Sequence, residues 1–192
     1  SNKAFYPSAK LGQYSLISCN IINKDKLIKV IRGSFCVINL VGILESKGNN
    51  DFETAHVKGI ETLIIACNIN KIEKIIHISA LGIEKNKISK YALTKIKSEN
   101  KIKKIKDSVI IRPSIVCGDE DKFLNFFARY AMLSPFMPLI GGGNTKFQPI
   151  LVTDLVNIIV ICINNKFKKG KILEVGGPDI LSFKEILQFM LS

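Results

Sequence analysis

Continuous apolar runs alternate with segments of helical periodicity along most of the chain. The clearest runs are Cys36 to Val41, Ile75 to Ile78 and Val109 to Ile111. Strands that are apolar throughout are typical of parallel sheets covered on both faces. Between the first two runs, Phe52 to Ile69 carries apolar residues near helical spacing. This alternation predicts an α/β fold built on a doubly wound parallel sheet.

Local polar residues indicate where the helices begin. Asn23, Ser89 and Asp154 each precede a periodic segment and are expected N-caps. Glu185 follows Ser182 at the spacing of a capping box. The expected helices are residues 23–32, 52–69, 89–105, 123–133, 154–163 and 182–191, and the further expected strands are residues 14–22, 147–152 and 171–175.

Composition restricts the class of protein. With 192 residues and 47% apolar content, the chain can bury one core, and no apolar run approaches the roughly 18 residues of a membrane-spanning helix. We therefore expect one soluble domain. The five cysteines are an odd number without metal-ligand spacing, and His56 and His77 lie far apart. We expect free thiols in a reducing compartment and no metal site.

The net charge of +12 comes almost entirely from lysine. Such a charge attracts phosphates and anionic membrane surfaces. Only Arg32, Arg112 and Arg129 offer a planar guanidinium for bidentate recognition. The densest lysine cluster, residues 101–106, alternates with isoleucine and is typical of a solvated helix end. We expect no nucleic-acid binding.

Candidate chemistry lies in the segment Tyr91-Ala92-Leu93-Thr94-Lys95. Residues at i and i+4 share one helix face, so Lys95 is expected to favour the phenolate of Tyr91. Together with the positive charge of a bound nicotinamide, it would bring the pKa of Tyr91 toward working pH and make it a general acid/base. Lys95 would also reach a ribose hydroxyl. Twelve residues upstream, Ser79 ends an apolar strand, where its hydroxyl could bind a substrate carbonyl oxygen. A half-exposed amphipathic helix is the alternative interpretation.

A strand ending in Ser79, the Tyr91/Lys95 pair and a strand ending in Arg112-Pro113 together resemble the extended short-chain dehydrogenase/reductase family. Several further stretches resemble one branch of it, the nucleotide-binding accessory subunits of respiratory complex I. These stretches are Leu11-Gly12-Gln13, Val37 to Gly42, His77 to Ala80, Glu120 to Ala128 and Lys146 to Pro149. The resemblance implies a Rossmann-like NAD(P)-binding fold.

The resemblance also implies the positions of the site residues. Asn39, Leu40, Val41 and Gly42 would follow the adenosine and pyrophosphate, Ser79, Tyr91 and Lys95 would surround the nicotinamide and its ribose, and Pro113, Ser114 and Ile115 would lie beside the nicotinamide. Each position has a structural alternative: Asn39 could bond only a neighbouring loop, Gly42 could serve a turn, and Pro113 could end a strand. The implied cofactor is NADP or NAD, with NADPH favoured by the resemblance.

One departure from the family concerns the pyrophosphate loop. The 13 glycines contain no Gly-x-x-Gly-x-x-Gly spacing, and Gly141 to Lys146 lacks the pattern of a phosphate loop. The likeness begins after the family's second strand. We therefore expect residues 1–192 to form a single truncated domain, incomplete at the N-terminus, with 119–150 inserted as a substrate-side segment.

Three functional hypotheses stay open from the sequence. The first is an accessory subunit docked on complex I in the matrix or at the bacterial cytoplasmic membrane, with a mainly structural nucleotide and vestigial catalysis. The second is a free NAD(P)-dependent reductase, epimerase or dehydratase that uses Ser79, Tyr91 and Lys95. The third is a basic module that binds anionic surfaces, and it rests on charge alone.

Overall fold

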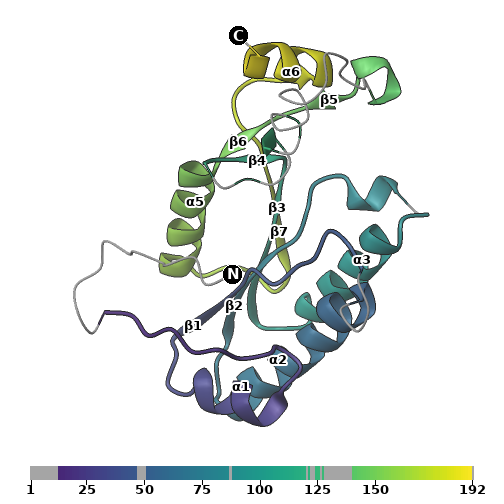
Figure 1. The fold of residues 1–192 in the computed structure, drawn as a ribbon. Helices are drawn as coiled ribbons and strands as arrows, with labels where there is room; N and C mark the ends of the chain where they lie inside the picture. Colours follow the sequence, from purple (N-terminus) through teal and green to yellow (C-terminus); the bar gives the residue numbers. More distant parts are fainter. Residues whose placement is uncertain are drawn as a thin grey trace.

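A four-stranded parallel sheet forms the centre of the molecule (Figure 1). The structure is a computed structural model, and it describes residues 13–46, 51–86, 88–119, 121, 124–125, 127 and 140–191. The strands are β1 (Cys36–Asn39), β2 (Lys74–Ile78), β3 (Asp107–Pro113) and β7 (Lys171–Val175), in that order across the sheet. The predicted parallel α/β sheet is confirmed.

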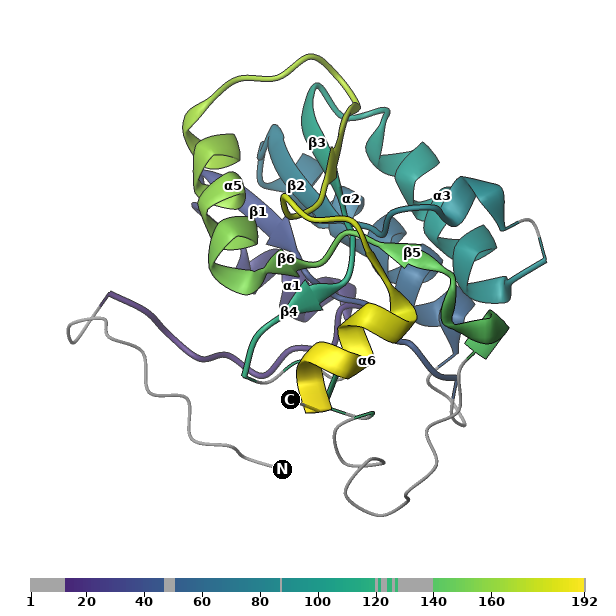
Figure 2. The same cartoon turned by 90° about the horizontal axis from the view of Figure 1, so that it is seen from above.

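Helices cover both faces of this sheet. α1 (Lys24–Val30), α2 (Gly59–Ile69) and α3 (Lys90–Ile102) lie on one face, and α5 (Val152–Asn164) lies on the other (Figure 2). Successive side chains of a strand point to opposite faces. Ile75 of β2 therefore packs in the core beneath α1 and α2, whereas Ile76 packs in the core beneath α5. This burial on both faces explains why the strands are apolar throughout.

Smaller elements extend the carboxyl end of the sheet. β4 (Val116–Cys117) pairs with β6 (Ile150–Leu151), and β5 (Lys146–Phe147) pairs with β8 (Leu181–Ser182). The remaining helices are the π-helix η1 (Glu53–Lys58), the 3-10 helices η2 (Ile83–Lys85) and η3 (Ile140–Gly143), and α6 (Phe183–Leu191). A Cβ at Gly177 would lie only 2.0 Å from the Pro149 carbonyl oxygen, so only glycine fits this close approach.

Three of the predicted caps are present. The Asn23 side chain accepts a hydrogen bond from the Lys26 amide at 3.1 Å, and Ser89 caps α3. Ser182 and Glu185 exchange the two bonds of a capping box at the start of α6. Asp154 is not a cap, because α5 begins at Val152, which places the aspartate inside the first turn.

Two strand predictions are wrong. Residues 14–22 form an irregular segment that is largely exposed, because no strand among the described residues pairs with this β-branched run. The strand expected at 147–152 is interrupted between β5 and β6, where Pro149 has no amide proton for a ladder. The predicted helix 123–133 falls mostly outside the described residues. No helix of the described part has the length and apolar character to cross a membrane.

Candidate functional site

Asn39 and His77 form a buried hydrogen-bonded pair at the carboxyl ends of β1 and β2. The Asn39 side-chain oxygen accepts from the Val41 amide at 3.2 Å, so its amide nitrogen donates to Nδ1 of His77 at 2.9 Å. Nε2 of His77 therefore carries the proton and donates to Ser98 Oγ, which in turn donates to the Lys95 carbonyl oxygen. Burial lowers the pKa of His77 to about 3. This chain of bonds fixes the turn after β1 to the helix α3.

His56 makes a second connection between the same loop and α3. Its Nε2 accepts from the Ile43 amide at 3.2 Å, so Nδ1 donates to Thr94 Oγ1 at 2.9 Å. Burial, and then the nearby Lys95 ammonium, lower the pKa of His56 to about 4. His56 lies in the π-helix η1, a conformation frequent at functional sites. No group of three metal-ligating side chains occurs within the described ranges.

Lys95 places a buried ammonium where the loops after β1 and β2 meet. Nζ donates to the Ile78 carbonyl oxygen at 3.0 Å, and a Cβ at Gly42 would lie 3.4 Å from Nζ. Burial lowers the pKa of Lys95 to about 8, while the nearby Glu99 carboxylate raises it. Gly42 thus leaves room for this ammonium, beside the exposed residues Leu40 and Val41.

Tyr91 stands one helical turn before Lys95 in a partly buried aromatic cluster. Its ring meets His56 edge-on at 5.5 Å between centroids and Phe52 at 6.0 Å. Burial raises the pKa of Tyr91 in this structure. The expected lowering of that pKa by Lys95 and a bound nicotinamide stays a prediction. The Lys95 ammonium is directed instead at the Ile78 carbonyl oxygen.

Ser79 follows β2 directly and is 5% exposed. Its amide donates to the Ile111 carbonyl oxygen at 2.7 Å, but within the described part of the chain its buried hydroxyl has no hydrogen-bond partner. An unpaired buried hydroxyl is destabilising by about 1 to 3 kcal/mol. A bound ligand with a matching polar atom would remove that penalty.

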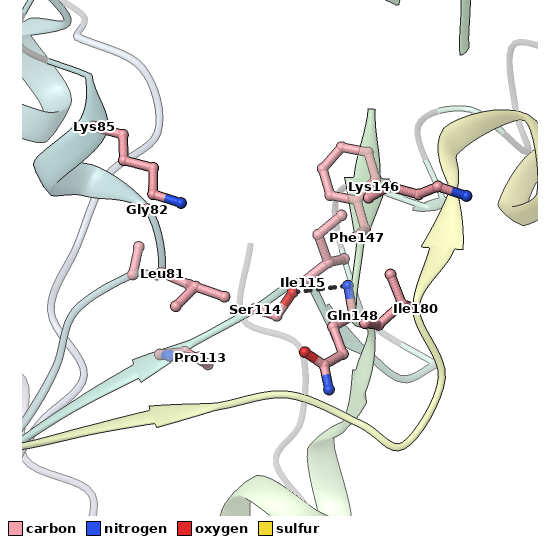
Figure 3. Close-up of a pocket in the computed structure, with 11 residues that line it drawn as sticks. Leu81, Gly82, Lys85, Pro113, Ser114, Ile115, Lys146, Phe147, Gln148 and Ile180 are labelled. Carbon is pink, nitrogen blue, oxygen red and sulfur yellow. Dashed lines mark hydrogen bonds between the residues drawn. The ribbon is translucent and has the colours of Figure 1, made fainter. Parts of the chain in front are cut away.

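A pocket of about 480 Å³ opens beside these residues (Figure 3). Pro113, Ser114 and Ile115 line one wall, and Ser114 Oγ accepts a hydrogen bond from the Gln148 amide at 3.3 Å. The other lining residues are Ala80, Leu81, Gly82, Lys85, Lys146, Phe147, Gln148 and Ile180. Apolar walls with two lysines suit a ligand that has an apolar body and an anionic group.

Arg112 binds carboxylates of the protein itself, whereas the sequence left it available for the bidentate recognition of a bound anion. Its Nε and Nη2 donate to the two carboxylate oxygens of the buried Glu99 at 2.9 and 2.8 Å. Nη1 lies 2.9 Å from Glu174 and 3.3 Å from Glu84. Carboxylates therefore already surround this guanidinium, and the network joins α3 to β3, β7 and η2.

Reasoning from the sequence missed this buried polar layer. Thr94, Ser98 and Glu99 lie on the face of α3 that packs against the sheet, where apolar residues are the rule. The sequence did contain a signal for this layer, because these three polar residues recur at helical spacing. The structure brings Asn39, Gly42 and Lys95 together and places Ser79 next to the pocket wall. The chemical roles assigned to these residues stay predictions.

Comparisons with known proteins show which family the chain is similar to. Residues 3–104 match the model of the 3-beta hydroxysteroid dehydrogenase/isomerase family. Two relatives carry the name NADH dehydrogenase [ubiquinone] 1 alpha subcomplex subunit 9, mitochondrial. The Arabidopsis thaliana protein is 32% identical over 94% of this chain, and the Mus musculus protein is 32% identical over 88%. The chain spans about half of these relatives, 46% and 45% of their lengths.

Solved structures share the fold at low sequence identity. The dTDP-glucose 4,6-dehydratase of Streptomyces venezuelae, solved with NAD and TYD bound, is 19% identical with a TM-score of 0.76, covering 90% of this chain and 61% of its own. The UDP-glucuronic acid 4-epimerase of Bacillus cereus, in complex with NAD, is 22% identical with a TM-score of 0.76, covering 89% and 63%. These structures show the fold that the chain shares. Because the family model covers more than half of the chain, the chain belongs to the 3-beta hydroxysteroid dehydrogenase/isomerase family.

Proposed function

We propose that this chain is the NAD(P)H-binding part of an accessory subunit of respiratory complex I, in which the nucleotide is mainly structural. The observation that carries the proposal is the 32% identity over 94% of the chain to a protein named as a mitochondrial complex I subunit. The proposed partners are the other subunits of complex I, and the proposed location is the matrix side of the inner mitochondrial membrane. Contact with the anionic membrane surface belongs to the same proposal.

The residues present would supply part of a dinucleotide site along the carboxyl edge, without a Gly-x-x-Gly-x-x-Gly loop for the pyrophosphate. Asn39, Leu40, Val41 and Gly42 would follow its adenosine and pyrophosphate, and the Lys95 ammonium would bind a ribose hydroxyl. Ser79, Tyr91 and the wall Pro113 to Ile115 would enclose the nicotinamide. The unpaired Ser79 hydroxyl and the space at Gly42 support this placement. We propose NADP(H) in preference to NAD(H).

A mainly structural role is supported by the environment of Tyr91. Burial raises the pKa of this phenol, which makes proton exchange near neutral pH unfavourable. Its ring instead packs between η1 and α3, the two elements that hold the nucleotide loop. A bound ligand stabilises such a site by mass action without any chemical step.

A free NAD(P)-dependent reductase, epimerase or dehydratase is the second candidate. The pocket of about 480 Å³ and the adjacent Ser79 hydroxyl favour it, because a substrate carbonyl could enter there. Segment 119–150 contributes the pocket residues Lys146, Phe147 and Gln148, which supports its proposed place on the substrate side.

Replacing Lys95 with methionine is expected to weaken nucleotide binding by about 1.5 to 3 kcal/mol, because a charged hydrogen bond to the ribose is lost. Complex I assembly should fall with it. Since burial lowers the pKa of Lys95 to about 8, wild-type affinity should decline as the pH rises above 8, and the variant's should not. Titration calorimetry with NADPH and NADH, and native gels of cells complemented with the full-length gene, measure these effects.

Tyr91→Phe separates the two candidates, because it removes the hydroxyl and keeps the ring. Normal assembly is expected with Tyr91→Phe, and also with Lys97→Met, a control that removes an exposed lysine paired to Glu53 two residues from Lys95. The opposite result would establish the free enzyme instead. In that case the wild type reduces a carbonyl with NADPH, Tyr91→Phe lowers the rate by roughly two to four orders of magnitude, and complex I assembly is normal in both.

A further inference from the structure

The amino ends of the four parallel strands form one surface, opposite the nucleotide edge. The register aligns Cys36 with Lys74 and Lys74 with Asp107, and β7 continues the sheet beside β3. The connections that enter these strands therefore meet at one end of the molecule. We call residues 31–35, 70–73, 103–106 and 165–170 the amino-end face.

Positive charge concentrates on this face. Its four connections carry eight basic side chains and a single acidic one, Glu73, which pairs with Lys106. The basic residues are Arg32, Lys71, Lys103, Lys104, Lys106, Lys166, Lys168 and Lys169. At the opposite end, we count the described residues from each strand to the next α- or π-helix. They carry six acidic side chains against two lysines; the acidic residues are Glu45, Asp51, Glu84, Asp119, Asp121 and Asp179, and the lysines are Lys85 and Lys146. Among the described residues, the amino-end face is therefore the basic end of the sheet and the opposite end is the acidic one.

The four connections are contiguous in space. Gly170 lies against the backbone of Lys103, since a Cβ there would be 3.0 Å from its Cα. The Phe167 amide donates to Asp107 at 3.2 Å, and the Lys106 ammonium lies 3.2 Å from Glu73. The basic side chains of the four connections therefore act on the same surface.

An exposed aromatic ring lies within this charged surface. Phe35 is 74% exposed, and its ring centroid is 6.0 Å from the Lys74 ammonium. The same ammonium binds the carbonyl oxygens of Cys162 and Asn165 at the end of α5, so the last turn of α5 lies beside Phe35. Ile161 of that turn is 57% exposed. Two exposed apolar side chains, Phe35 and Ile161, thus lie at the end of the molecule that carries the basic connections.

We infer that the amino-end face docks on the surface of an anionic lipid bilayer. The lysines lie at the level of the phosphate headgroups, and Phe35 and Ile161 enter the interface between headgroups and acyl chains. A polybasic cluster with an exposed aromatic residue combines the two attractions that interfacial binding requires. In this orientation the nucleotide edge, at the other end of the sheet, faces the aqueous phase. The inference specifies the membrane contact within the proposed function and rests on it.

Lipid headgroups fit this face better than nucleic acid. Seven of its eight basic residues are lysines, which act as point charges, and only Arg32 offers a guanidinium for bidentate recognition of bases. Phe35 is the only strongly exposed aromatic residue of the four connections, so successive bases would find no stacking platform.

Vesicle co-sedimentation of the 192-residue chain tests the inference. Vesicles of phosphatidylcholine with about 20% cardiolipin should bind the chain, vesicles of phosphatidylcholine alone should not, and binding should weaken as salt rises. The variant Lys166→Ser/Lys168→Ser/Lys169→Ser should lower the partition coefficient by on the order of 100-fold. Phe35→Ser should lower it by roughly five- to tenfold and leave the salt dependence unchanged, because it removes apolar contact only.

The matched control is Lys58→Ser/Lys90→Ser/Lys184→Ser, which removes three exposed lysines outside the face and should stay within about twofold of the wild type. Circular dichroism verifies that each variant is folded. If the triple variant on the face binds like this control, or if duplex DNA competes fully for the chain at equal phosphate concentration while Phe35→Ser has no effect, the inference is wrong. Neither result bears on nucleotide binding, which the Lys95 titration tests independently.

Discussion

Replacing Arg112 with methionine is expected to lower the free energy of unfolding by about 3 to 5 kcal/mol. The carboxylate of Glu99 is 1% exposed, and both its oxygens accept hydrogen bonds from this one guanidinium. Without it, the buried carboxylate of Glu99 keeps the Lys103 ammonium at 4.0 Å and the nearby Lys95 ammonium, and neither replaces the two hydrogen bonds of the guanidinium. Urea unfolding followed by circular dichroism measures the loss.

The double variant Arg112→Met/Glu99→Leu should recover most of that stability, because Glu84 and Glu174 are half-exposed and need no partner. Lys106→Met breaks the exposed pair with Glu73 and should cost at most about 1 kcal/mol. A single Arg112→Met variant as stable as the Lys106→Met control would contradict the buried network.

Lowering the pH from 7.5 to 5 is expected to reduce the free energy of unfolding by about 4 kcal/mol, roughly half from each histidine. Burial holds the pKa of His56 near 4 and that of His77 near 3 in the folded chain, against about 6.5 when unfolded. Below pH 6.5 the unfolded chain therefore binds two protons that the folded chain excludes, so stability falls as pH falls. The pKa of Lys95 is also lowered in the folded chain, so its unfavourable contribution is relieved only as the pH rises from about 8 to 10.5, outside this window.

Urea unfolding at half-unit pH steps gives the free energy of unfolding as a function of pH. Its slope at pH 5.5 should correspond to the uptake of about two protons on unfolding. The variant His56→Gln should reduce the slope to about one, since one of the two titrating groups is removed. A wild-type stability that does not change between pH 7.5 and 5 would sink the assignment of both histidines as buried and neutral.

The sequence by itself determined the architecture. Ile75, Ile76 and their neighbours are apolar throughout because both faces of a parallel strand are covered, and Ser89 and Ser182 cap helices through contacts only three residues away. Such signals involve residues that are close together in the sequence, so they can be recognised without the tertiary structure. The strand expected at residues 14–22 failed because pairing requires a partner that local propensity does not supply.

The tertiary structure alone decided the chemistry of the site. Tyr91 and Lys95 were found from their spacing, yet the direction of the Tyr91 pKa depends on burial. The lysine ammonium binds the Ile78 carbonyl oxygen, a contact that the spacing does not indicate. Likewise Arg112 meets Glu99 and Glu174 only because α3, β3 and β7 pack side by side. Burial and electrostatic interactions depend on distances between residues that lie tens of positions apart, and folding fixes those distances.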